Sequence, residues 1–175
     1  MSAAPGPGGP AWFSALGAPL GVAERAAIDS ILAEGGVPGG GGIVVVPDWT
    51  ALAVSLRLSE QDDQWWNREE DEREALWDLA TLRHTEDELE SAIAGAVDAA
   101  RGPIARAIGV AMARAGTGDA ALGEAARAAA LLCVHQHALA AAAGASSGHL
   151  FYRKQALFAA GRWPIGVVAG RYHVF

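Results

Sequence analysis

The residues best suited to metal chemistry are a cysteine and two histidines in the C-terminal half of the chain. Cys133 and His137 lie four positions apart, a spacing that puts two side chains on one face of a helix. His149 follows, and thiolate and imidazole are common ligands of Zn²⁺. This pattern leaves open a small-molecule or metal site near Cys133, His137 and His149. Because a lone cysteine on an Ala-rich helix is usually a small buried apolar residue, we predict no metal or cofactor here.

A second pattern, Gly144 to Gly148, has the letters Gly-x-Ser-x-Gly of a nucleophile elbow. In that motif the serine lies on a strained turn that leads from a strand into a helix. An Ala-rich helical stretch precedes Gly144, so the required strand is missing. We expect a loop between two helices, with Ser146 or Ser147 capping the second. The sequence therefore predicts no catalytic residue and favours a binding role over an enzymatic one.

Charge is sorted along the chain into two blocks. Residues 60–90 hold thirteen acidic side chains and three arginines, for a net charge of −10. Residues 99–175 hold seven arginines and one lysine against two acids, for a net charge of +6. Such blocks either attract each other within the fold or attract separate partners of opposite charge. The sequence leaves both arrangements open.

Two adjacent tryptophans lie inside the acidic block. Aromatic side chains with charged neighbours are typical of protein interfaces, where the ring supplies buried area and the charges supply orientation. The sequence therefore predicts a binding module of the inhibitor, immunity or accessory type that docks a basic protein partner. The predicted partner-binding residues are Trp65, Trp66, Glu69, Glu70, Asp71 and Glu72. The alternative is that both tryptophans belong to the core and the acids form a solvated face.

Composition narrows the classes of function. With 175 residues, 51% of them hydrophobic, the chain is long enough for one domain with a substantial core. The net charge of −7 argues against nucleic acid as the main partner. The single cysteine rules out an internal disulfide and favours the cytoplasm, and the excess of arginine over lysine is typical of a GC-rich bacterial genome. Composition does not decide whether the chain forms a homo-oligomer.

Two further segments bear on location. Residues 1–19 are predicted to be a flexible Gly/Pro-rich leader without the basic and apolar regions of a signal peptide. The end of the leader is expected to dock through Trp12, Phe13 and Leu16. Residues 20–175 are predicted to form a single mainly helical domain. The stretch between Arg127 and Arg153 carries no formal charge, but it is mostly alanine with polar residues at its centre. We therefore expect a buried helix there and no membrane partner.

The predicted fold is mainly α within the α+β class. It is a compact helical bundle around an Ala-rich central helix, with a small C-terminal β-hairpin. Helices are predicted over residues 22–34, 61–82, 85–100, 103–115, 119–143 and 150–160. Caps support three of these boundaries: the capping box from Thr85 to Glu88, Asp119 before the central helix, and Gly144 after it. The polar run 67–74 spans two helical turns, and we expect it not to face the core.

The strand predictions rest on shorter signals. The β-branched run at residues 43–46 predicts a strand. Residues 52–58 alternate apolar and other residues, which predicts a second strand in a hairpin with the first, although the same residues also fit a helix. The C-terminal hairpin is predicted around residues 165–168 and 172–175, with Ala169 and Gly170 in its turn and Phe175 in the core.

Overall fold

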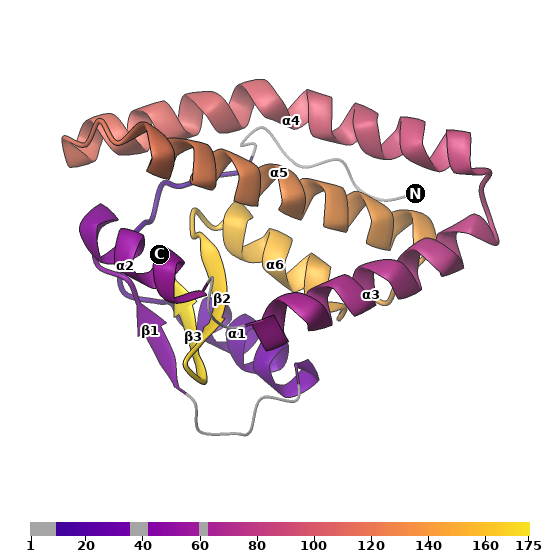
Figure 1. Ribbon diagram of the computed structural model, residues 1–175, viewed down its shortest axis with the longest axis horizontal. Helices are drawn as coiled ribbons and strands as arrows, with labels where there is room; N and C mark the ends of the chain where they lie inside the picture. Colours follow the sequence, from indigo (N-terminus) through magenta and orange to yellow (C-terminus); the bar gives the residue numbers. More distant parts are fainter. Residues whose placement is uncertain (1–9, 36–41, 60–62) are drawn as a thin grey trace.

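The fold is built on a long helical hairpin that covers a small sheet and shorter helices (Figure 1). The computed structural model describes residues 10–35, 42–59 and 63–175. In this part of the chain the elements are α1 (Val22–Glu34), β1 (Ile43–Val45), α2 (Trp49–Ser59), α3 (Asp63–Thr81), α4 (Glu86–Ala115), α5 (Ala120–Ala143), α6 (Leu150–Ala159), β2 (Pro164–Val168) and β3 (Arg171–Val174). The predicted class, mainly α with a small β element, is confirmed.

The Ala-rich helix α5 is the central helix, as predicted. It packs against α3, α4 and α6, and Figure 1 shows it running alongside α4 over most of its length. The Asp119 carboxylate caps its start by accepting N–H bonds from Ala121 and Leu122. Gly144 ends it in the left-handed conformation, with φ of 66°. Both predicted boundaries are confirmed.

Helix α4 differs from the prediction because it does not stop near residue 100. It begins at the predicted capping box, continues through Pro103 and ends at Gly116, 30 residues later. Buried Ile93 and Ile104 lie eleven positions apart, which is close to three helical turns. The apolar stripe therefore stays in phase across the proline. Packing of this stripe against α5 outweighs the loss of one backbone hydrogen bond at an exposed position.

The three strands form a sheet in the order β1-β3-β2. The predicted C-terminal hairpin is confirmed: β2 and β3 are antiparallel, and the turn residues Ala169 and Gly170 both have positive φ, as a two-residue turn of this kind requires. Strand β1 pairs with β3 in parallel, with Val45 opposite Val174. Phe175 is buried, as predicted.

The predicted strand at residues 52–58 is wrong, because this segment is helix α2. The Asp48 carboxylate accepts a hydrogen bond of 2.8 Å from the Ala51 N–H and so starts the helix. Trp49, Leu52 and Ser55, which are three positions apart, are its buried face. The helical periodicity, which was the competing interpretation, therefore decides the structure here.

The described end of the predicted leader packs onto α6. Trp12 and Phe13 are buried, with ring centroids 5.5 Å and 5.8 Å from that of Phe158. The guanidinium of Arg162 donates to the carbonyls of this segment and to the Glu24 carboxylate. Residues 1–9 lie outside the described part of the chain, and the boundary at residue 20 stays a prediction. No helix among the described residues is long and apolar enough to cross a membrane.

Candidate binding cleft

Helix α3 divides the predicted partner-binding residues between its two sides. Trp65 and Glu69 face inward, with 7% and 4% of their surface exposed. Trp66 is 52% exposed, and Glu70 and Asp71 are exposed with it. The six predicted residues therefore do not form one surface. Two of them belong to the interior of the molecule.

Glu69 is the centre of a buried polar network. The Lys154 ammonium of α6 donates to both of its carboxylate oxygens, at 2.8 Å and 2.6 Å. The Trp65 indole N–H donates at 3.0 Å, and the Gln136 amide of α5 donates at 3.3 Å. Lys154 also donates to the Gln136 side-chain oxygen at 3.2 Å. This network ties together the three helices α3, α5 and α6.

The expectation that residues 67–74 do not face the core is wrong at Glu69. A buried carboxylate is costly unless charge and hydrogen bonds compensate it. Here one ammonium and two N–H donors compensate the carboxylate of Glu69. The polar type of Glu69, taken alone, therefore predicted the solvent side of the helix, although the side chain is buried.

The two charge blocks meet at this network. Lys154 pairs with Glu69, and His149 lies 3.6 Å from the Glu72 carboxylate. The other basic side chains of the C-terminal half that form long-range ion pairs reach acids outside the block: Arg153 pairs with Glu34, and Arg162 with Glu24. Among the described residues, pairing with the C-terminal half thus involves only Glu69 and Glu72 of the acidic block.

Most of the acids in residues 69–90 face solvent. Asp71, Glu74 and Asp78 are exposed at spacings of three and four residues along α3. In the described ranges, none of these three forms an ion pair with a basic side chain. Glu86, Asp87 and Glu90 are exposed in the first turns of α4. We name these six exposed residues and Glu70 the acidic face.

An open cleft of about 410 Å³ lies behind this helix, between α2, α3, α5, α6 and β2. Its aromatic wall consists of Trp65, Trp66, Phe158 and Trp163. On α5 it is lined by three small side chains, Ala125, Ala128 and Ala129, and by the larger Leu132. Glu69 and Lys154 also line the cleft, so the buried ion pair forms its polar floor. Pockets of this size with aromatic walls and few polar groups are the usual form of small-molecule sites.

The candidate metal residues are not brought together. In the described part of the chain no three His, Cys, Asp or Glu side chains are placed to hold a metal ion. Cys133 is fully buried, and its Sγ lies 3.3 Å from the Gln155 side-chain oxygen. Burial raises the pKa of the Cys133 thiol to about 12, so the thiol stays protonated at neutral pH. It packs as a small apolar residue, as predicted.

The two histidines of this candidate site have separate environments. His137 packs against the ring of Tyr152, with centroids 5.1 Å apart, and burial lowers its pKa. His149 caps α6, because its Nδ1 accepts the Phe151 N–H at 3.2 Å. The expectation that Ser146 or Ser147 caps this helix is therefore wrong. The loop does connect two helices, as the rejection of a nucleophile elbow requires.

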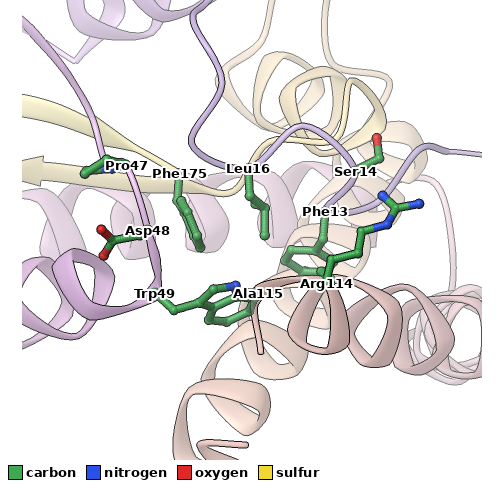
Figure 2. Close-up of a pocket in the computed structure, with 10 residues that line it drawn as sticks. Phe13, Ser14, Leu16, Pro47, Asp48, Trp49, Arg114, Ala115 and Phe175 are labelled. Carbon is green, nitrogen blue, oxygen red and sulfur yellow. The ribbon is translucent and has the colours of Figure 1, made fainter. Parts of the chain in front are cut away.

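A second hollow, of about 250 Å³, lies where the N-terminal segment meets α2 and the end of α4. Figure 2 shows Phe13, Trp49 and Phe175 lining it, with Arg114 on one side and Asp48 on the other. The Asp48 carboxylate is already used to cap α2, and Arg114 is exposed. This hollow was not predicted, because it depends on how the N-terminal segment packs.

Comparisons of the chain with models of protein families, with curated proteins and with solved structures find no match.

Proposed function

We propose that the chain is a cytoplasmic binding protein that docks a basic protein partner through the acidic face. The observation that carries this proposal is the row of Asp71, Glu74 and Asp78, which points outward and has no basic partner among the described side chains. The acids at the start of α4, Glu86, Asp87 and Glu90, are exposed as well. Trp66, half-exposed beside Glu70, offers an aromatic contact at its edge.

This proposal changes the set of contact residues. Trp65 and Glu69 are removed because they are buried, and Glu72 is partly buried beside His149. Glu74 and Asp78 take their place on the exposed side of α3. The proposed class of partner, a basic protein, is unchanged.

The physical expectation is binding that depends strongly on salt. Exposed charges that are not paired within the chain steer a partner of opposite sign, and the effect is screened within about 8 Å at physiological ionic strength. Loss of the charges should slow association more than it speeds dissociation. The Trp66 ring should contribute mainly to the dissociation rate, since buried aromatic contacts hold a complex together.

The test is a charge reversal with a matched control. The first variant combines Asp71→Lys, Glu74→Lys and Asp78→Lys. The control makes the same change in net charge elsewhere, with Asp29→Lys, Asp98→Lys and Glu124→Lys, all at exposed positions.

Both variants and the wild type are used as bait in lysate of the source cells at low salt. A protein counts as the partner only if the wild type and the control capture it, the reversal variant does not, and high salt releases it. We expect that protein to be basic, and its purified form to bind Trp66→Ala more weakly. Capture of the same proteins by all three baits would contradict the proposal.

A further inference from the structure

We propose that the cleft between α2, α3, α5, α6 and β2 binds a small uncharged molecule with a flat aromatic body. Trp66 lies at the edge of both this cleft and the acidic face, but the other residues that line the cleft are not part of that face, and the proposal does not depend on the proposed partner. Its size, about 410 Å³, is within the range of sites that take drug-sized molecules. The chemical class of the occupant follows from the walls and from the floor.

The walls favour an aromatic occupant. Four aromatic side chains line the cleft, and three of them, Trp65, Phe158 and Trp163, are buried and held in place. The fourth, Trp66, is 52% exposed at the edge of the cleft. A flat ring placed in the cleft would cover exposed indole surface of Trp66 and gain stacked or edge contacts with the other rings.

The floor favours an occupant without charge. Glu69 and Lys154 carry opposite charges, so the floor is neutral overall. The three ammonium protons of Lys154 have three acceptors, the two Glu69 oxygens and the Gln136 oxygen. A charged group on the occupant would have to break these bonds to find a counter-ion. An uncharged molecule can displace water from the cleft while the floor keeps its hydrogen bonds.

Helix α5 supplies the space. Ala125, Ala128 and Ala129 line the cleft with methyl side chains, so any longer side chain at these positions would project into it. Ala128 is exposed, and a larger residue there can be accommodated without disturbing the core. This position therefore allows the cleft to be filled while the fold is kept.

The test uses a neutral fluorescent probe, N-phenyl-1-naphthylamine, titrated into the full-length protein. We expect saturable binding to one site, and at least about tenfold weaker binding to the Ala128→Phe variant. The matched control is Ala141→Phe, an exposed alanine of the same helix outside the cleft, which should bind like the wild type. Trp66→Ala, also at an exposed position, should weaken binding several-fold and gives a second line of evidence.

The charge of the occupant is tested with 8-anilinonaphthalene-1-sulfonate, a related probe with an anionic group. We expect it to bind about tenfold more weakly than the neutral probe. The reversal variant of the acidic face should bind the neutral probe unchanged, which separates this site from the partner surface. Non-saturable binding, equal binding to Ala128→Phe and Ala141→Phe, or preference for the sulfonate would each overturn the proposal.

Discussion

The Lys154 and Glu69 pair predicts a large and specific loss of stability when one partner is removed. Both side chains are almost fully buried, with 8% and 4% of their surface exposed. Lys154→Met keeps the length of the side chain and removes its charge. The carboxylate of Glu69 then keeps only its bonds from Trp65 and Gln136. Breaking a buried pair in this way costs about 3–5 kcal/mol, and the two remaining donors place the expected loss near the lower value.

A second substitution should recover much of this loss. In the Lys154→Met background, Glu69→Gln removes the unpaired charge but keeps an oxygen that can accept the Trp65 N–H. The new amide group can also donate to the Gln136 oxygen, which has lost its bond from Lys154. We expect the double variant to be about 2 kcal/mol more stable than Lys154→Met alone. Such coupling would identify the charge pair itself, and not the loss of side-chain packing, as the cause.

Urea unfolding measures these differences. Circular dichroism follows the helices, and fluorescence follows the tryptophans, of which the chain has six. Coincident transitions and equal urea dependence would justify a two-state comparison. The matched control is Arg101→Met, which removes one partner of the exposed pair between Arg101 and Asp98, with a distance of 2.8 Å. That change should cost less than about 0.5 kcal/mol.

Two results would refute this reasoning. If Lys154→Met lost no more stability than the Arg101→Met control, the buried pair would not compensate the Glu69 carboxylate as the distances indicate. If the double variant were no more stable than Lys154→Met alone, the unpaired charge of Glu69 would not be the cause of the loss.

Three further predictions follow from buried or strained positions. Because burial raises its pKa to about 12, the Cys133 thiol should react with Ellman's reagent at pH 8 only after unfolding, as absorbance would show. Gly166→Ala should lower the free energy of unfolding in urea by about 2–4 kcal/mol, because φ is +123° and the added Cβ would lie 2.8 Å from the Trp65 ring of α3. The matched control is Gly170→Ala, at a turn position with open space around it, which should cost about 1 kcal/mol. Hydrogen bonding to Arg162 lowers the pKa of Glu24, so this pair stabilises the fold at neutral pH and loses that effect as the pH falls through the lowered pKa. The difference in thermal midpoint between wild type and Arg162→Met should therefore be largest near pH 7 and should shrink in acid.

The elements that could be predicted from the sequence are those with strong local signals. Thr85, Asp119 and Gly144 mark helix ends through hydrogen bonds that involve only nearby residues. Ala169 and Gly170 mark the hairpin turn through a conformation that glycine adopts easily. Signals of this kind act in the isolated chain, so tertiary packing did not overrule them.

The elements that were predicted wrongly depend on packing across the fold. Residues 52–58 fit both period two and a helix, and the cap at Asp48 with the burial of Trp49 decides for the helix. Pro103 is a reasonable place for a helix to begin, but the contacts of α4 with α5 continue on both sides of it. Local rules could not supply these long-range contacts.

The buried network had a signal that residue type concealed. Lys154 lies three positions after Phe151 and three before Leu157, on the apolar face of α6. Gln136 lies likewise between Cys133 and Leu139 on the buried face of α5. A polar residue in phase with apolar neighbours on both sides indicates burial, and it requires a partner. The positions of Lys154 and Gln136 together therefore predict an interior polar cluster. They do not predict which acidic residue pairs with Lys154.

The same network determines what the rest of α3 can do. Glu69 occupies a position in phase with Trp65, Leu76 and Ala80, which are buried residues of the same helix. The bond from Glu69 to Lys154 therefore fixes the rotation of α3 about its own axis. This rotation sends the neighbouring acids outward and turns Trp66 toward the cleft.

The partner surface and the cleft thus share one structural support. Substitutions at Asp71 or Glu74 should affect partner binding alone, and Ala128→Phe should affect probe binding alone. Lys154→Met should weaken both, because a loosened α3 no longer presents either side correctly. Lys154 itself lines the cleft, so its effect on probe binding can be direct, whereas its effect on the acidic face can act only through α3. If Lys154→Met kept full partner binding at a temperature where it is folded, the ion pair would not position α3, and the link between the two sites would be wrong.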